Sequence, residues 1–425
     1  MTTKLFRGDA PVLRQLTTLT PGGTIEVGDK FIVALNGKAL SYSATGTSVA
    51  SVTAGLAAAL AASTIPEFAE IEWVDAGTAV TATGPSDGAP FTLSVSTTES
   101  NDSAADAQTF TATTTVAAQS GEHWNAAANW SPSGVPQTGD DVYLDNFAGD
   151  VKYGLDQSAV TLASLHLTAS FTGEIGLPKI NTSAGPGADS YFEYRDDYLR
   201  ISATSVVVGQ GGEGAGSGRI KLDTGSAQTT LEVFRTGTPV EAGLKSLLWK
   251  GTHASNVVRV SAGSVDLAPH AGETAVVATL SIGFQTNPTA DADVRSGVGV
   301  TLTTVTKTGG ALQTASAITT LTLGPDSGEH DHTAGGITTV NGHGSTLLYR
   351  STSTLATVHA GEGFVLDFRR DPRPRTVTTL NPQAGAAIRD PGKTVTFSNA
   401  IALPVGVSLA DLVLDVGDNR TITIA

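Results

Sequence analysis

The stretch ITTLTLGPDSGEHDHTAGGITTVNG, residues 318–342, contains two nearly identical tetrapeptides, ITTL and ITTV. The same form, aliphatic–x–Ser/Thr–aliphatic, recurs through much of the chain. Its copies are LASL (162–165), LKSL (244–247), VATL (277–280), LTTV (302–305), ITTL (318–321), ITTV (337–340), LATV (355–358) and VTTL (377–380). The last six begin 25, 16, 19, 18 and 22 residues apart, and most are followed by a Gly-containing turn and a second alternating run. Strand-like repeats of about 20 residues predict a solenoid with one coil per repeat, since propeller blades need about 40–45 residues.

The composition also indicates a β-rich fold. The chain has 425 residues, which is enough for two or three domains. Gly is abundant at 48 residues, whereas charged residues make up 15% and aromatic residues 6%. Short apolar runs between Gly, Asn, Asp and Ser predict many strands and turns, and the plentiful aliphatic residues argue against disorder. Low aromatic content favours the stacked Val, Leu, Ile and Thr of a parallel β-helix. A pair of β-sandwiches is the alternative.

Charge and cysteine content narrow the possible functions. The net charge of −15 argues against a nucleic-acid partner, because no basic stripe is present to neutralise phosphates. The densest basic stretch, FRRDPRPR (368–375), is interpreted as a protruding turn, with an anion site as the alternative. Cysteine is absent, which excludes disulfides and Cys-ligated zinc. The first residues lack the apolar core of a signal peptide, and the apolar run 49–62 is shorter than the ~20 residues of a membrane span. We therefore expect a soluble chain made in the cytoplasm.

The first quarter of the chain predicts a small α+β module. Residues 1–20 show no clear periodicity and are expected to form an N-terminal arm, and the module is expected to span residues 21–117. TIEVGDKFIVALNGKALSYSA (24–44) alternates on both sides of Asn36-Gly37, which is a strong hairpin signal. After the potential cap Ser48, helical spacing links Val49, Val52, Leu56 and Leu60. The runs EIEWV, TAVTATG and PFTLSVSTT predict further strands.

This segment resembles a module that recurs in bacteriophage tail proteins and other virion proteins. The matching motifs are GDKF, NG and YSA in the hairpin, VASVTAGLAAAL (49–60) in the helix, and the closing run VTATGPSDGAPFTLSV (80–95). The resemblance covers roughly the first quarter of the chain. It implies a structural protein of a phage particle, a docking role for this module and no catalytic residues.

A second motif lies in residues 118–150. In SGEHWNAAANWSPSGVPQTGDDVYLDN (120–146), Trp124, Asn129, Trp130, Pro136 and Asp140 match the W-x4-N-W-S entry motif found ahead of parallel β-helices in autotransporter-like and phage surface proteins. The resemblance implies that residues 151–425 form a right-handed parallel β-helix. An open end of such a helix exposes unpaired backbone and apolar side chains, which bulky tryptophans can cover. We interpret the tryptophans as this cap, since Trp is more often buried, and sugar binding is the alternative.

Three other patterns were weighed for chemistry. GQGGEG (209–214) fits a dinucleotide-binding fingerprint, but glycines and a strand follow it where a helix would have to hold the pyrophosphate, so a turn is expected. YFEYRDDYLR (191–200) places Glu193, Asp196 and Asp197 among aromatic residues. Some phage β-helices build polysaccharide-cleaving sites from such carboxylate pairs. The alternatives are a solvated outer loop and a lateral contact between subunits, and the alternation of Tyr with charged residues favours the contact. The eight histidines form no recognisable catalytic arrangement.

The segment EHDH (329–332) is the one candidate metal site. In an extended strand His330 and His332 would point the same way, so that three chains around an axis would present six imidazoles. The preceding PDSG (325–328) is a turn signal, however. We therefore expect EHDH to lie in a variable outer loop of the solenoid, with the metal site of a trimer as the minor alternative.

These observations predict a mostly β protein, a right-handed parallel β-helix preceded by a small α+β module. The two resemblances predict a non-enzymatic bacteriophage structural protein on the virion surface. It would be a capsid decoration or a fibre-like appendage, homotrimeric and anchored to capsid or tail through its N-terminal part. No catalytic residue, cofactor, metal, nucleic acid or membrane is expected. One alternative is a tailspike or adhesin that recognises, and in some cases cleaves, host surface glycans. An autotransporter-like passenger would need a secretion signal or a translocator, and neither is expected from this sequence.

Overall fold

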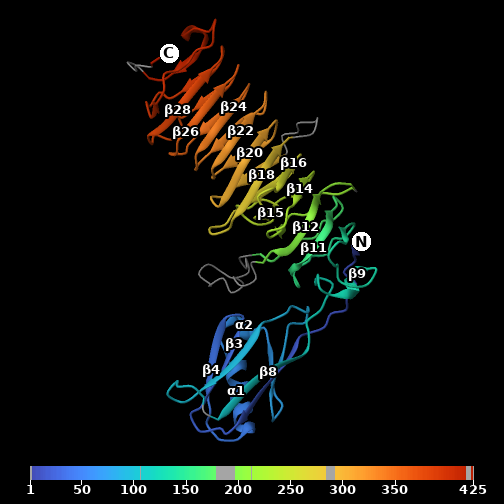
Figure 1. The fold of residues 1–425 in the computed structure, drawn as a ribbon. Helices are drawn as coiled ribbons and strands as arrows, with labels where there is room; N and C mark the ends of the chain where they lie inside the picture. The colour runs from blue at the N-terminus through green and yellow to red at the C-terminus, as the bar shows by residue number, and fades with distance from the viewer. Residues whose placement is uncertain are drawn as a thin grey trace.

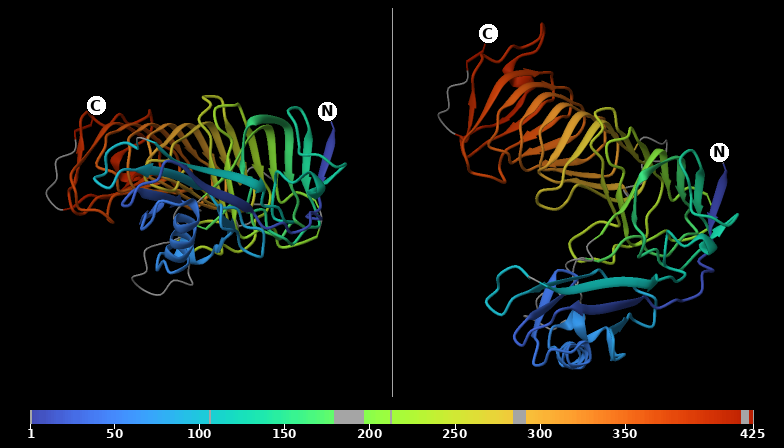
Figure 2. Two further views of the ribbon diagram at one scale, coloured as in Figure 1. Left: turned by 90° about the horizontal axis from the view of Figure 1, so that it is seen from below. Right: turned by 60° about the horizontal axis from the view of Figure 1, so that its bottom comes forward.

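The computed structural model describes residues 2–105, 107–178, 197–211, 213–283, 292–417 and 423–424. It is mostly β, with 45% strand and 6% helix. Figures 1 and 2 show strands stacked one after another along most of the molecule, with a separate group of strands and helices beside the first of them. The mostly β fold predicted from composition is confirmed.

One long parallel sheet is built from even-numbered strands, which Figure 1 shows side by side. Each strand from β12 onward pairs with the strand two places further along the chain. The members are β12 (Leu199–Val208), β14 (Thr230–Val233), β16 (Val257–Val260), β18 (Ala275–Ile282), β20 (Val300–Lys307), β22 (Ile318–Leu323), β24 (Ile337–Gly342), β26 (Leu355–Ala360), β28 (Arg375–Pro382) and β30 (Val395–Phe397). We call this the even sheet.

The odd-numbered strands form a second parallel ladder, the odd sheet, with the same pairing rule. Its members are β13 (Ile220–Asp223), β15 (Leu247–Lys250), β17 (Gly263–Leu267), β19 (Ala292–Ser296), β21 (Ala311–Thr314), β23 (Glu329–His332), β25 (Thr346–Tyr349), β27 (Val365–Asp367), β29 (Ala387–Arg389) and β31 (Val413–Asp415). Each repeat of the chain therefore contributes one strand to each sheet, which is a solenoid-like arrangement.

The tetrapeptide repeats stack in register in the even sheet. The first aliphatic residues of the last six copies pair with one another, and so do the second ones. The two aliphatic positions are three residues apart, so a regular strand would point them to opposite faces, yet both are buried. The strand pairing skips the second position of the tetrapeptide in every copy. The motif therefore marks a bend that turns both aliphatic side chains inward.

One of the predicted copies does not belong to the even sheet. In LKSL (244–247) only the last residue, Leu247, begins a strand, and that strand is β15 of the odd sheet. Lys245 and Ser246 precede the strand and bond instead to neighbouring repeats: Lys245 pairs with Asp293, and the Ser246 hydroxyl donates to the Gly237 carbonyl at 2.6 Å. A four-residue match is short enough to arise by chance, and this one does not share the stacking.

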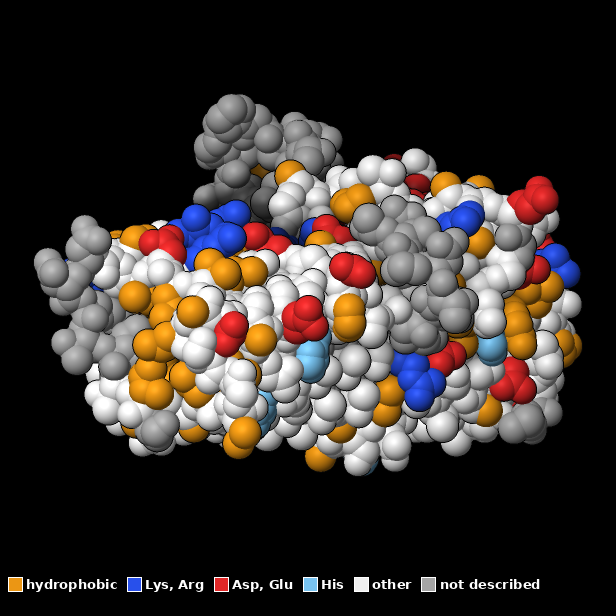
Figure 3. Space-filling model, turned by 90° about the horizontal axis from the view of Figure 1, so that it is seen from above, with side chains coloured by type: hydrophobic (Ala, Val, Ile, Leu, Met, Phe, Trp, Pro, Cys, Tyr) orange, Lys and Arg blue, Asp and Glu red, His pale blue; other side chains and the backbone are white. Residues whose placement is uncertain are grey.

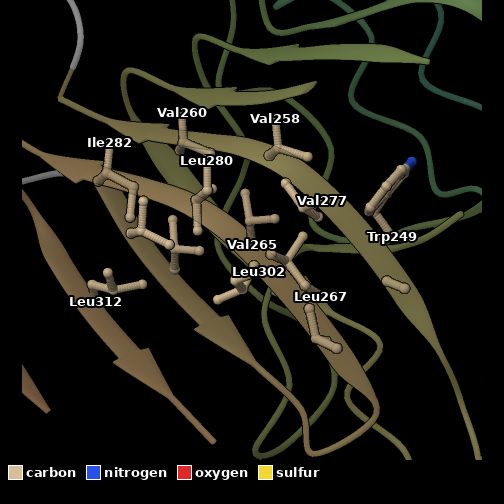
Figure 4. Packing of buried hydrophobic residues seen from close by; sticks show 14 of the residues in the cluster. Trp249, Val258, Val260, Val265, Leu267, Val277, Leu280, Ile282, Leu302 and Leu312 are labelled. Carbon is tan, nitrogen blue, oxygen red and sulfur yellow. The ribbon is translucent and has the colours of Figure 1, made fainter. Parts of the chain in front are cut away.

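The core lies between the two sheets. Figure 4 shows Val258 and Val260 of β16, Leu280 of β18 and Val265 and Leu267 of β17 pointing into the space between the strands. These five side chains are all fully buried and belong to one continuous cluster that runs through the stack. Burying one such side chain is worth about 1.5–3 kcal/mol relative to exposure. Stacked aliphatic residues are thus the main source of stability, as the low aromatic content predicted.

The N-terminal residues join the solenoid before the module begins. β1 (Thr3–Phe6) pairs in parallel with β10 (Asp141–Leu144), which pairs with β11 (Asp156–Leu167) and through it with β12. The short β9 (Trp130–Ser131) lies antiparallel to β1. The sequence predicted only an arm here. The first strand instead extends the stack beyond β10, after which the chain forms the module and returns to the stack at β9.

The module has two small antiparallel sheets and two helices around its own core. One sheet has the order β5 (Glu72–Asp75), β6 (Val80–Thr83), β2 (Leu16–Gly23), β8 (Gln108–Val116), and the other has the order β4 (Lys38–Ser43), β3 (Lys30–Leu35), β7 (Leu93–Thr98). The helices are α1 (Val49–Ala61) and α2 (Pro66–Ala69). Short 3-10 turns lie at Ala127–Asn129 and Leu409–Asp411.

The local predictions for the module are confirmed. Asn36 and Gly37 both have positive φ and join β3 to β4, as a hairpin turn of this composition requires. Ser48 caps α1, since its hydroxyl accepts from the Ser51 backbone N–H at 3.2 Å. The strands β2 and β8 were not predicted. Among the helices in the described part of the chain, none is long and apolar enough to cross a membrane.

Candidate functional site

The two tryptophans of the entry motif are buried at the start of the solenoid. Trp124 is fully buried and Trp130 is 3% exposed. Their ring centroids lie 4.8 Å apart in an edge-to-face contact, and Phe6 of β1 packs on Trp130 at 4.9 Å. The indole N–H of Trp130 donates to the Trp124 carbonyl at 2.7 Å. Buried rings present no face on which a sugar can stack, so the geometry favours the cap.

Asn129 holds the crossing between the module and the solenoid. It is fully buried, and its side-chain oxygen accepts from the Ala10 backbone N–H at 2.6 Å. Its amide donates to the carbonyls of Ser120 and His123 at 2.9 and 2.8 Å. One side chain thus fixes the outgoing and the returning chain, which explains why an asparagine stands between the tryptophans.

The EHDH segment is a strand, and the prediction of an outer loop is wrong. β23 pairs with β21 on one side and with β25 on the other. The turn signal PDSG is correct, but the loop ends before EHDH begins. His330 stands in register with Leu312 and Leu347, and it is fully buried, as is His332. His330 occupies an inward position that aliphatic side chains fill in the neighbouring repeats, whereas the inward column of His332 also contains Ser296, Thr314 and Tyr349.

A single threonine bridges the two imidazoles. One ring nitrogen of His330 donates to the Leu312 carbonyl at 3.1 Å, and one of His332 donates to the Gly335 carbonyl at 2.8 Å. The remaining nitrogens face the Thr314 hydroxyl at 3.1 and 2.8 Å. In neutral rings both of these nitrogens are acceptors, and one hydroxyl has one hydrogen to donate. The neutral pair is therefore one hydrogen bond short.

Both histidines are nevertheless neutral near pH 7. Burial lowers the pKa of His330 well below its usual value, and the nearby His332 and Lys307 lower it further. Burial lowers the pKa of His332 to about 4. One unmade hydrogen bond costs about 1–3 kcal/mol, whereas an imidazolium without a carboxylate partner in a dry core costs more. The pair is thus a point where acid is expected to destabilise the solenoid.

The metal site of a trimer does not fit this geometry. Rings that lie between the sheets and bond to their own chain cannot meet the rings of two other chains on an axis. Within the described ranges, no group of three or more His, Asp and Glu side chains is placed to hold a metal ion.

Lys307 is a second polar residue in the core that sequence patterns did not indicate. It ends β20, where its partners in register are Ile282 and Leu323, and it is fully buried. Its ammonium donates to the Ser327 carbonyl, and no carboxylate of the described chain lies within ion-pair distance of it. Burial lowers the pKa of Lys307 to about 8. An unpaired buried cation is a cost to folding.

Replacing Lys307 by Met is therefore expected to raise the free energy of unfolding by about 1–2 kcal/mol at pH 7, because Met fills the same volume without the charge. The gain should shrink as the pH rises from 8 towards 10.5, where the folded wild-type chain is already neutral and its stability rises. Urea unfolding at pH 7 and pH 10 measures this. Lys221→Met is the matched control: Lys221 is also fully buried, but it lies 3.4 Å from Glu241, so its loss should destabilise. Equal effects of both changes would contradict the prediction.

The basic stretch FRRDPRPR connects β27 to β28, and the predicted turn is confirmed. Its arginines are already paired within the chain. Arg369 lies 2.7 Å from Asp367, and Arg373 and Arg375 lie 2.5 and 3.0 Å from Asp371. Hydrogen bonding by Arg373 holds the pKa of Asp371 well below its usual value. This internal pairing disfavours the anion site.

The remaining sequence candidates are only partly described. Glu193 and Asp196 lie outside the described residues, so the carboxylate cluster stays a prediction. Asp197 is described and lies 3.5 Å from Arg200. The glycine-rich GQGGEG follows β12. The residues described between β12 and β13, which exclude Gly212, contain no helix, in agreement with the predicted turn.

The outward face of the odd sheet is rich in charges that neutralise one another. Asp266 accepts two hydrogen bonds from the Arg295 guanidinium, at 2.6 and 2.7 Å. Asp331 accepts two from Arg350 at the same distances and one from Gln313 at 3.0 Å. Figure 3 shows one face of the molecule on which basic and acidic side chains lie next to each other in small groups. In such pairs the carboxylate and the guanidinium neutralise each other, so that little net charge remains to attract a binding partner.

The outward face of the even sheet is different, and we call it the threonine face. It comprises the second and third tetrapeptide positions and the residue two places after the third, on the six strands β18 to β28. None of these eighteen residues is buried or charged, and twelve are threonines. They are Ala278, Thr279, Ser281, Thr303, Thr304, Thr306, Thr319, Thr320, Thr322, Thr338, Thr339, Asn341, Ala356, Thr357, His359, Thr378, Thr379 and Asn381.

Comparisons of the chain with protein-family models, with curated proteins and with solved structures found no match. The threonine face was not singled out from the sequence, although a signal for it was present. The third tetrapeptide position is Thr in all six repeats, and the residue two places later is Ser, Thr, Asn or His.

Proposed function

We propose that the chain is a non-enzymatic structural protein on the surface of a bacteriophage particle, either a capsid decoration or a fibre-like appendage. The observation that supports this most is the presence of two separate cores. The segment with the phage-like motifs packs around one of them, and the stacked repeats pack around the other. A module with its own core suits attachment to a particle, and a long stack of strands suits a rigid extension.

In this proposal the two sheets are walls of a right-handed parallel β-helix. Consecutive strands alternate between the two sheets, which supports this arrangement. β12 supports it too, because it contacts both sheets: its first residues pair with β13, as Leu199 does with Leu222, and its last residues pair with β14, as Val206 does with Leu231. The crossover connection between two parallel strands of one sheet is right-handed in nearly all proteins. Such a helix satisfies its backbone between coils and stays stable without disulfides.

The partners proposed are capsid or tail proteins, contacted through the N-terminal module, and further copies of the chain in a homotrimer. The chain would be made in the host cytoplasm and reside in the virion. Its net charge of −15 favours basic patches on the partner that carries it.

Location is tested by electron microscopy of intact particles labelled with antibodies against the full chain. We expect labels at regular positions on the particle surface. Unlabelled particles, or labels confined to the bacterial surface, would contradict the proposal. Binding of the chain to purified host polysaccharide would favour the adhesin alternative.

Attachment through the module has its own prediction. Val27 and Val74 are 66% and 47% exposed on the module, while Val298 is 72% exposed on the solenoid. Changing Val27 and Val74 together to Lys is expected to weaken co-sedimentation with particles that lack the chain by about tenfold, the equivalent of 1.4 kcal/mol. Val298→Lys, which also adds positive charge at an exposed valine, should leave binding unchanged. Equal loss in both variants would place the contact elsewhere.

A further inference from the structure

Most hydroxyls of the threonine face make no hydrogen bond within the described part of the chain. Among the described residues, only three of its eighteen side chains have hydrogen bonds. Asn381 and His359 bond to each other at 3.4 Å, and the Thr379 hydroxyl accepts from the amide of Asn399, outside the face, at 2.9 Å. On the odd sheet, by contrast, outward side chains such as Asp266 and Asp331 are fully engaged with neighbours. The threonine face therefore offers donors and acceptors that the chain itself does not use.

This face is also suited to recognise itself. A hydroxyl both donates and accepts a hydrogen bond, so an array of threonines is complementary to an identical array, as a two-fold contact between like subunits requires. Strands repeat about every 4.8 Å, so that the six strands extend the array by about 24 Å with the same period in every copy. Small β-branched side chains let two sheets approach to about 10 Å.

Charge points to the same occupant. Two copies with a net charge of −15 repel each other over most of their surfaces. The threonine face is an extended region without charged side chains, so copies can meet there without burying an unpaired charge. The face has eighteen residues, close to the 20–30 per partner of a standard interface. It lacks the aromatic rings and carboxylates that sugar sites use, and it lacks the cations that nucleic acid needs.

We propose that the threonine face joins copies of this chain side by side. The inference concerns the same partner as the proposed function, a further copy of this chain, but it gives a two-fold pair in place of the proposed homotrimer, because a self-complementary face joins two copies about a two-fold axis. The occupant of the face is a second copy, packed sheet against sheet through the hydroxyls of β20, β22 and β24 at its centre.

Sedimentation of the full-length chain tests this interface. Wild type is expected to associate at micromolar concentration. The double variant Thr320→Lys/Thr339→Lys should sediment as a monomer, with its dissociation constant raised at least a hundredfold. The matched control Ala311→Lys/Thr346→Lys adds two lysines at outward, unburied positions of the odd sheet and should associate like wild type. A monomeric wild type, or a face variant that associates like wild type, overturns the interface.

A second measurement covers a face variant that folds poorly. The chain has no cysteine, so Thr338→Cys on the exposed centre of the face introduces a single thiol. Oxidation is expected to link two copies through a disulfide, whereas Ala311→Cys on the odd sheet should stay unlinked. Absence of a link at position 338, or equal linking at both, overturns the proposal. The location on the particle is tested separately by microscopy, since a monomer can also be attached there.

Discussion

Lowering the pH from 7 to 4 is expected to destabilise the repeats around β23 by several kcal/mol. In the unfolded chain His330 and His332 take up protons near pH 6.5, the ordinary pKa of histidine. In the folded chain burial lowers the pKa of His332 to about 4 and that of His330 well below its usual value. Between these values the unfolded chain binds more protons, so stability falls as the pH falls. For His332 alone, the difference amounts to about 3 kcal/mol at pH 4.

Carboxylates act in a lower pH range. Arg369 helps to lower the pKa of Asp367, and Arg373 lowers that of Asp371, despite the opposing effect of burial. The stability that these groups contribute is lost only as the pH falls below about 4, where the unfolded carboxylates are protonated first. The range from pH 6.5 to pH 4 therefore belongs mainly to the histidines.

Hydrogen exchange of the backbone amides in β21, β23 and β25 at pH 7, 5 and 4 measures the effect locally, after correction for intrinsic rates. The module strands β3 and β4 serve as an internal reference. His330→Leu matches its register partners Leu312 and Leu347, so it should reduce the pH dependence to the part that His332 contributes, while the strands stay protected at pH 7. The same pH dependence in wild type and variant would show that His330 does not contribute.

The even sheet could be predicted from the sequence because its signal is local and repeated. In the last six tetrapeptides, two aliphatic residues and a threonine recur at fixed positions, and stacking in register imposes the same chemistry on each of these repeats. The odd sheet has no such motif. Its inward columns mix Val265, Ser296, Leu312, His332 and Tyr349, so no pattern of residue types announces it.

The burial of His330 and His332 and the pairing of β1 were not predicted, for reasons of geometry. Polar residues that follow a turn signal are usually predicted as part of a loop. Only the register of β23 with β21 and β25 shows that His330 occupies the position that leucine fills in the two neighbouring strands. β1 pairs with β10, so that Leu5 lies opposite Tyr143, although most of the first third of the sequence separates the two residues. A strand of four residues has too little periodicity to predict a contact over that separation.

Replacing Trp130 by Ala is expected to remove about 3–5 kcal/mol of stability from the first repeats. The change deletes the ring between Phe6 and Trp124 and the hydrogen bond to the Trp124 carbonyl. It leaves a cavity where β1 and β9 close the start of the stack. We expect faster hydrogen exchange in β1, β9 and β10, and a lower melting temperature for the solenoid.

The matched control is Trp73→Ala in the module. Trp73 is 9% exposed, stacks on Phe68 at 6.0 Å and donates its indole N–H to the Phe68 carbonyl at 2.9 Å. The same chemistry is thus removed from the other core. Because the two clusters are separate, Trp73→Ala should accelerate exchange in β5 and β6 and leave β10 and β11 unchanged. If Trp130→Ala left β1 and β10 as protected as in wild type, burial of the tryptophans would not be what closes this end of the solenoid.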